Sequence, residues 1–144
     1  MHLNRGVEYG IEGLAYLAQA GSDRSTLLRE VSRATSIPET FLSKIFQRLV
    51  RSGLVRSRRG FHGGFLLARP ASQITLREVV EALQGPITTP AGEAGSETDF
   101  SGRARQAVRQ AVERAQSRVR AVFEEVTLAD LASAGFSAPA ETHL

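Results

Sequence analysis

Residues 38–52 constrain the fold of this chain more than any other segment, because they predict a helix with two sharply different faces. Four apolar side chains recur at the spacing of a helix packed on a core, at Leu42, Ile45, Phe46 and Leu49. The opposite face carries hydroxyl, amide and cationic groups, at Thr40, Ser43, Lys44, Gln47 and Arg51. Such groups bond base edges and phosphates in DNA. We therefore expect one side of this helix to face the core and the other to be available to a nucleic acid.

A short helix before this segment and a hairpin after it complete the pattern. Residues 27–35 predict a helix, with Thr26 as its candidate N-cap, so that two helices flank a tight break. Residues 54–58 and 65–67 predict two strands joined by an Arg- and Gly-rich turn at 59–64. A basic hairpin directly after the second helix is typical of a winged helix-turn-helix, because Arg suits the minor groove of DNA. Two other interpretations stay open: an ordinary amphipathic helix pair, and glycines that serve only the turn.

The positive charge of the chain is concentrated in this region. The whole chain has a formal net charge of +3. Residues 24–69 hold ten basic side chains and only Glu30 and Glu39 as acids, which makes this basic block +8 and the remainder −5. A basic block in an otherwise acidic chain favours a polyanionic partner such as double-stranded DNA, although a solvated arginine-rich surface would give the same count. Its cations are Arg24, Arg29, Arg33, Lys44, Arg48, Arg51, Arg56, Arg58, Arg59 and Arg69.

The segments around the basic block predict further helices. Residues 5–20 predict a helix that is apolar on nearly all sides, which favours burial on more than one side. Thr75 and Glu78 have the spacing of a capping box that begins another helix, and Gly85-Pro86 ends it. Residues 88–102 are rich in Pro, Gly, Ser, Thr and acids, so they predict a mobile acidic loop.

A long helix is predicted over residues 103–126, and Thr127 is a candidate cap for a short helix at 128–134. A helix of that length is longer than a small domain needs, so its apolar stripe favours contact with a second subunit. The expected fold class is mainly α with a small β wing: a winged helix-turn-helix plus a long C-terminal dimerisation helix. The predicted segments are a DNA-binding domain at 1–87, the loop at 88–102, the dimerisation and terminal helices at 103–134, and a frayed tail at 135–144.

Several stretches of the chain resemble the Rrf2 family of bacterial transcription regulators. They are MHLNRGVEYGIEGLAYLA at the start, then IPETFLSKIFQRLVRSGLVRSRRGFHGGFLLARP, ITLREVVEALQGPI and the late VTLADLA. The wing pattern GLV-x-S-x-RG-x-x-GG-[FY]-x-L is the most specific part. The resemblance covers residues 1–87 closely and 103–134 more loosely. It implies a homodimer on pseudo-palindromic operators, with the third helix in the major groove, the wing in the minor groove, and each long helix crossing its partner and packing on the first helix.

The resemblance also implies which residues read DNA. By position they are Thr40, Phe41, Ser43 and Lys44 on the helix and Arg59 on the wing. Many cluster-binding relatives have Glu where Ser43 stands and Gln where Lys44 stands, so their operator sequences do not transfer to this chain. Neighbouring groups complete the predicted contact set: Gln47, Arg48, Arg51, Arg58, His62 and Gly63. For His62, a polar turn residue is the simpler interpretation.

Many relatives hold an iron–sulfur cluster through cysteines in the loop before the long helix. This chain has no cysteine, and carboxylates alone do not replace thiolates, so we expect no cluster, no metal and no other cofactor. Glu8 aligns with an acidic cluster ligand of some relatives. Together with Tyr9 and Glu12 it marks a candidate sensing or dimer contact. Because Glu8 and Glu12 share a helix face and repel each other, pairing with arginines of a neighbouring long helix is the simpler interpretation.

The expected function is a homodimeric DNA-binding transcription regulator, acting as a repressor. No phosphate-binding loop, paired carboxylates or nucleophile triad indicates an enzyme. The chain lacks a signal peptide and an apolar run of about 20 residues, which predicts a cytoplasmic protein with no membrane partner. Two alternatives stay open: a regulatory module controlled by binding a partner enzyme, and a small-molecule sensor with a pocket near Tyr9 and Tyr16, between the first and the long helix.

Overall fold

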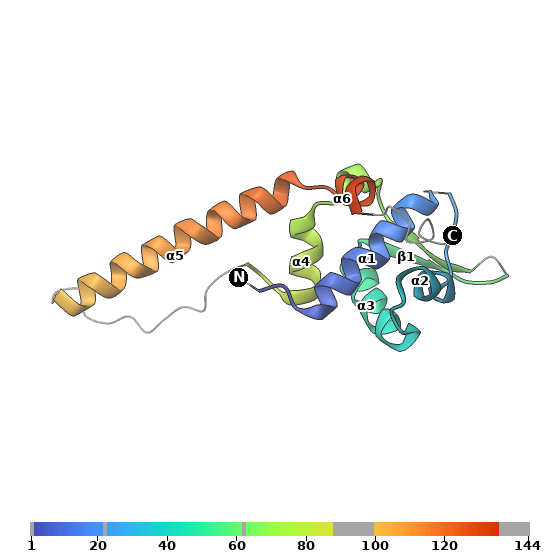
Figure 1. The fold of residues 1–144 in the computed structure, drawn as a ribbon, viewed down its shortest axis with the longest axis horizontal. Coiled ribbons are helices and arrows are strands. Elements are labelled where there is room, and N and C mark those ends of the chain that lie inside the picture. Colours follow the sequence, from blue (N-terminus) through green and yellow to red (C-terminus); the bar gives the residue numbers. More distant parts are fainter. Residues whose placement is uncertain (1, 22, 62, 88–99, 136–144) are drawn as a thin grey trace, which may run out of the picture.

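The computed structural model describes residues 2–21, 23–61, 63–87 and 100–135. The fold class predicted from the sequence is confirmed, because a two-stranded antiparallel sheet accompanies an otherwise helical chain. In Figure 1 the sheet and all α-helices except α5 form one body, and α5 extends from it on the side away from the sheet. The elements are α1 (Arg5–Ala20), α2 (Leu28–Thr35), α3 (Glu39–Arg51), β1 (Val55–Arg58), β2 (Gly64–Leu67), the 3-10 turn η1 (Ala71–Gln73), α4 (Leu76–Gln84), α5 (Phe100–Glu125) and α6 (Leu128–Gly135).

Helix α1 runs through the centre of the body and is buried on several sides, as predicted. It packs against α2, α3, α4, α6 and β2. Two glycines let its backbone come close to its neighbours. A Cβ at Gly10 would collide with Leu83 of α4, and one at Gly13 would lie 2.9 Å from a ring carbon of Phe46 in α3. Helix α1 therefore holds α3 and α4 at fixed positions.

The predicted apolar face of α3 is confirmed. Leu42, Phe46 and Leu49 are fully buried, and Ile45 is nearly so. Pro38 is the N-cap rather than the first helical residue, and its carbonyl oxygen accepts from the N–H groups of Phe41 and Leu42. The helix ends before Gly53, whose φ of 79° is left-handed and favours glycine.

Thr26 does not cap α2, contrary to the prediction. Leu27 is the N-cap and contributes no side-chain hydrogen bond. Thr26 is fully buried, and its backbone exchanges two hydrogen bonds of 2.8 Å each with Phe65 of β2. This isolated bridge makes Thr26 a one-residue third strand of the sheet, because pairing with a distant segment outweighs the local capping preference.

The predicted capping box of α4 is confirmed. The Glu78 N–H donates to Thr75 Oγ1 over 3.2 Å, and the Thr75 N–H donates to a Glu78 carboxylate oxygen over 3.0 Å. Thr127 caps α6 in the same way, as predicted, with the Asp130 N–H donating to its hydroxyl oxygen. Thr75 and Thr127 also form an isolated bridge, which fastens the start of α6 to the start of α4.

The long helix begins earlier than predicted. Helix α5 starts at Phe100, so residues 100–102 belong to it and not to the acidic loop. Ser101 and Gly102 have low helix propensity, which led the sequence pattern to place the start too late. The rest of the predicted loop, 88–99, and residues 136–144 of the predicted tail lie outside the described residues. Within the described part of the chain, no helix is long and apolar enough to span a membrane.

Candidate nucleic-acid interface

The outer face of α3 is open to solvent along its length. Of the DNA contacts predicted on this helix, Ser43 is partly buried. The others are exposed: Thr40, Phe41, Lys44, Gln47, Arg48 and Arg51. Ser36, between α2 and α3, has a left-handed φ of 61° and donates its N–H to the Ser32 carbonyl oxygen over 2.8 Å. This tight break and the buried inner face fix the direction in which the outer side chains project. The arrangement is that of a helix-turn-helix.

We define the wing as β1, β2 and the loop 59–63 between them. The strands pair from Val55 opposite Leu67 to Arg58 opposite Gly64. The Gly63 N–H donates to the Gly60 carbonyl oxygen over 2.9 Å, which closes a turn at the tip. Arg58 and Arg59 are exposed there, whereas His62, a predicted DNA contact, lies outside the described residues.

The glycines of the wing have a structural reason, which was one of the two interpretations left open above. A Cβ at Gly63 would lie 2.8 Å from the carbonyl oxygens of Arg58 and Gly60. At Gly64 the φ is 145°, and a Cβ would lie 2.6 Å from the Thr26 carbonyl oxygen. The hairpin restricts Gly63 to glycine, and the bridge between β2 and Thr26 restricts Gly64.

Most cations of the basic block are available to meet a polyanion. Arg24 pairs with Glu30 at 2.6 Å, and Arg69 pairs with Glu78 at 2.7 Å. The remaining cations of the block are exposed and form no ion pair with any other described residue: Arg29, Arg33, Lys44, Arg48, Arg51, Arg56, Arg58 and Arg59. Arg29, Arg33 and Arg56 were absent from the predicted contact set, although the charge count contains them. Helices α2 and α3 and the wing lie together at one end of the molecule (Figure 1), so these charges reinforce one another.

Helix α1 places the candidate sensing residues beside α3. The Tyr9 and Phe41 ring centroids are 6.3 Å apart. Glu8 is exposed and Glu12 is partly buried. Burial, and secondarily the charge of Glu8, raise the pKa of Glu12. Neither carboxylate has an ion-pair partner among the described residues.

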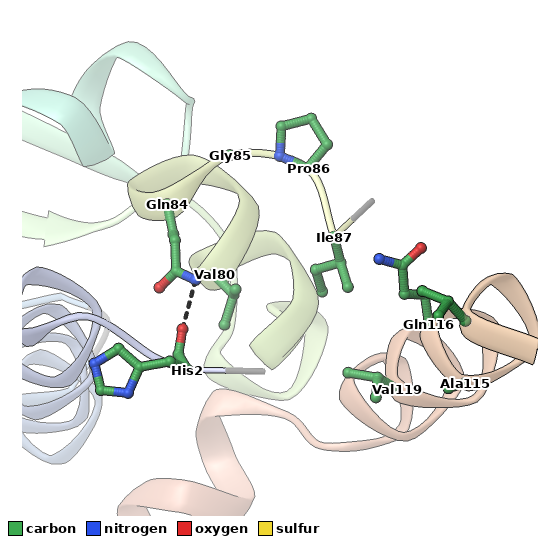
Figure 2. Close-up of a pocket in the computed structure, with 10 residues that line it drawn as sticks. His2, Val80, Gln84, Gly85, Pro86, Ile87, Ala115, Gln116 and Val119 are labelled. Atoms are coloured by element: carbon green, nitrogen blue, oxygen red, sulfur yellow. Dashed lines mark hydrogen bonds between the residues drawn. The ribbon is translucent and has the colours of Figure 1, made fainter. Parts of the chain in front are cut away.

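A groove of about 400 Å³ lies between the end of α4 and α5 (Figure 2). Its walls include Val80 and Ile87 on one side and Val119 on the other, with the Gln84 and Gln116 amides among its polar groups. Gln84 Nε2 donates to the His2 carbonyl oxygen over 2.8 Å. Tyr9 and Tyr16 are not among the lining residues. The groove therefore differs in position from the pocket expected between the first and the long helix.

The residues present do not fit an iron–sulfur cluster. Such clusters need thiolate ligands, and the chain has no cysteine. Glu8 and Glu12 supply only hard carboxylate oxygens, and among the described residues no group of three or more His, Asp or Glu side chains is placed to hold a metal ion.

Sequence comparison connects this geometry to known proteins. Residues 3–134 match the Rrf2 family, described as iron-dependent transcriptional regulators. The Mycobacterium tuberculosis protein Rv1287, named as an HTH-type transcriptional regulator, is 32% identical over 132 residues, which are 92% of this chain and 81% of Rv1287. The HTH-type transcriptional regulator IscR of Cereibacter sphaeroides is 33% identical over 116 residues, covering 80% of this chain and 75% of IscR.

Solved structures share the fold over nearly the whole chain. The Bacillus subtilis protein CymR, described as the global cysteine regulator, superposes with a TM-score of 0.75 at 26% identity, covering 92% of this chain and 97% of CymR. IscR from T. potens superposes with a TM-score of 0.66 at 22% identity, covering 92% and 87% of the two chains. The exposed face of α3 and the basic wing agree with these matches. Because the family match extends over residues 3–134, the chain belongs to the Rrf2 family of DNA-binding transcription regulators.

Proposed function

We propose that this protein is a homodimeric repressor that binds a pseudo-palindromic operator, with α3 in the major groove and Arg59 in the adjacent minor groove. The observation that carries the proposal is the exposed polar face of α3 beside a wing whose arginines have no ion-pair partner among the described residues. Repression is the expected direction, because a dimer bound across an operator excludes other proteins from the same DNA.

The N-terminal part of α3 is the part that reads bases in this docking geometry. Thr40, Ser43 and Lys44 offer hydroxyl and ammonium donors to base edges, and Phe41, which is 54% exposed, offers an apolar contact to a thymine methyl group. Side chains further along α3 and on the wing face the phosphates and set the register of the complex. The proposed phosphate contacts are Gln47, Arg48, Arg51, Arg58, His62 and Gly63.

The apolar stripe of α5 supports the homodimer. Val108 and Val122 are 64% and 54% exposed, and the small residues Ala111 and Ala115 between them are exposed as well. A valine-bearing stripe on a helix that leaves the body is covered when a second copy lays its own α5 across it. That arrangement would also bring arginines of one protomer toward Glu8 and Glu12 of the other.

The test is to capture genomic DNA fragments with the purified protein and to sequence them. We expect one enriched, two-fold-related motif with half-sites about one helical turn apart, and affinity that falls steeply with salt as phosphate contacts release counterions. Arg59→Ala should weaken binding to that motif by about 1–3 kcal/mol and relax selection where the minor groove is narrow. Arg105→Ala, an exposed arginine of α5, is the matched control. Parental affinity in Arg59→Ala would refute the wing assignment.

We further propose that the protein works without an iron–sulfur cluster, since the chain supplies no thiolate ligand. Protein purified without oxygen should show no visible absorption band of a cluster and should bind its operator equally well with and without an iron chelator. A cluster-type band in that spectrum would overturn this proposal.

The α4–α5 groove supports an effector as the signal, which is the alternative in which a small molecule or partner enzyme controls the chain. The groove combines apolar walls with two amide side chains, a composition common to small-molecule sites. Val119→Phe would fill it. If the groove is the effector site, this variant should keep operator binding but lose the response to the effector in a reporter strain.

A further inference from the structure

An aromatic side chain stands at the apex of the wing. The loop 59–63 has five residues, counted from the last strand pair of Arg58 with Gly64, and Phe61 is the middle one. Phe61 is 100% exposed, more than Phe41 at 54% or Phe100 at 80%. The turn pattern at residues 59–64 gives Phe61 no role, although an apolar aromatic residue stands there among glycines and an arginine.

The hairpin holds this side chain at its tip by construction. The bond from the Gly63 N–H to the Gly60 carbonyl oxygen makes Phe61 the second residue of a tight turn. Gly60 has a φ of 101°, and Gly63 has no room for a Cβ, so the turn depends on both glycines. A polar residue would satisfy this turn equally well. The Phe61 side chain is 100% exposed, so DNA that covers the ring would gain the hydrophobic free energy of removing it from water.

We propose that Phe61 is an apolar wedge that enters the minor groove beside Arg59 and partly unstacks a base step, so that the protein bends its operator. Apolar side chains inserted between base steps kink DNA by about 20–90°. The inference rests on the proposed docking of the wing, and it adds a residue and a DNA deformation to it. Because flexible pyrimidine–purine steps unstack most easily, the wedge makes the operator selective at a step that no hydrogen bond reads.

A protein partner is the other class of ligand that an exposed aromatic ring could bind. The charges around the tip favour DNA. Arg58 and Arg59 immediately precede the turn and are exposed, and the loop 59–63 contains no acidic residue. Two carboxylates line the same hollow as Phe61, Asp23 and Glu30, and Glu30 is paired with Arg24. Arg59 is suited to the negative potential of a narrow minor groove, and it lies two residues before the ring.

The experiment compares Phe61→Ala and Phe61→Leu with the parent in the full chain, on the operator fragment selected by the parent protein. Binding is measured by fluorescence anisotropy, bending by energy transfer between dyes at the two DNA ends, and unstacking by 2-aminopurine placed at the steps facing the wing. We expect Phe61→Ala to bind about tenfold or more weakly and to bend the fragment less. Phe61→Leu is the matched control, because it keeps an apolar wedge and should retain most of both the affinity and the bend.

The outcomes separate the wedge from the docking it rests on. A parent protein that selects no DNA sequence overturns the proposed function and the wedge with it. A parent that selects and binds its operator, with Arg59→Ala weakened but Phe61→Ala unchanged in affinity, bending and 2-aminopurine signal, overturns the wedge alone and points to a protein ligand for the ring. Since Phe61 is fully exposed, its replacements should unfold at the parental temperature, and thermal unfolding verifies this.

Discussion

Two contacts between single residues fix the position of the wing relative to α3. Thr26 holds β2 through its paired hydrogen bonds with Phe65, and the Phe65 ring meets the Phe46 ring of α3 edge-on, with centroids 5.2 Å apart. Phe46 is fully buried under α1. The base of the wing is thus tied to the core face of the helix whose other face is proposed to read DNA, so that both elements can meet one DNA surface as a rigid unit.

Gly64→Ala should lower the free energy of unfolding by about 1–3 kcal/mol. The φ of 145° disfavours an L side chain, and the new Cβ would lie 2.6 Å from the Thr26 carbonyl oxygen. Gly53→Ala is the matched control, because Gly53 also has a positive φ, of 79°, but a methyl group added there would meet no other atom within 4 Å. Urea unfolding should give the larger loss for Gly64→Ala. Equal losses would mean that the wing moves away from Thr26 at little cost.

Thr26→Val should stabilise the protein by about 1 kcal/mol. The Thr26 hydroxyl is buried and has no hydrogen-bond partner in the structure as described, while its backbone bridge survives a β-branched replacement. Thr26→Ser, which keeps the hydroxyl and loses the methyl group, should destabilise instead. The same urea titrations measure both variants, and a clearly destabilised Thr26→Val would show that the hydroxyl has a partner.

At the scale of elements, caps and close contacts position α4 and α6 around α1. The Thr75 capping box begins α4, and the Leu76 N–H donates to the Val126 carbonyl oxygen over 2.8 Å, which links the end of α5 to α4. Arg120 of α5 donates to the Ile87 carbonyl oxygen, and Arg77 of α4 lies 3.4 Å from Glu124. The C-terminal part of α5 is therefore fixed to the body, and the groove between α4 and α5 has defined walls.

Glu78→Gln should destabilise the protein at neutral pH by about a few tenths of a kcal/mol, and this loss should vanish in acid. Burial raises the pKa of Glu78, but hydrogen bonds from the Thr75 N–H and from Arg69 outweigh it, so the pKa is lowered overall. A carboxyl with a lower pKa in the folded state adds stability above its unfolded pKa and loses it as the pH falls through the folded pKa.

The measurement is urea unfolding of both proteins from pH 7 down through the range in which Glu78 titrates. Thr75→Ala is the control, because it removes a neutral cap and should cost about 0.5–2 kcal/mol even in acid. A Glu78→Gln loss that persists unchanged at low pH would show that the carboxylate charge contributes nothing.

Helical periodicity and local capping chemistry predicted the elements that depend on neighbouring residues. The stripe of Leu42 and Phe46 and the Thr75 box are of this kind, and the structure confirms them. Thr26 was misassigned because a threonine before an apolar run looks like a cap, whereas its pairing with Phe65 depends on residues far along the chain. The groove between α4 and α5 was not predicted for the same reason, since the contact between these helices has no local signature. The DNA-contact residues stay predictions, and the structure adds that those described are accessible.

On the scale of the whole molecule, α5 is the element that would set the distance between the two α3 helices of the proposed dimer. Its 26 residues give a length of about 39 Å, close to the roughly 34 Å between successive major-groove faces on one side of DNA. Its C-terminal part is held by the protomer's own body through Val119 and Phe123. The remainder offers Val108 and Ala111 to solvent, so a crossing partner helix would both cover the stripe and set the distance between the two copies of α3.

Val122→Glu tests this arrangement, because it places a charge in the stripe at a residue that is 54% exposed in the protomer. The variant should stay folded, since the side chain reaches solvent when no partner is present, but should sediment as a monomer where the parent sediments as a dimer. Gln110→Glu adds the same charge on α5 at an exposed position off the stripe and should remain dimeric. Because a monomer engages one half-site only, Val122→Glu should lose much of its affinity for the full operator while binding an isolated half-site like the parent. A Val122→Glu protein that still sediments as a dimer would place the interface elsewhere and would leave the α5 stripe without the role assigned to it.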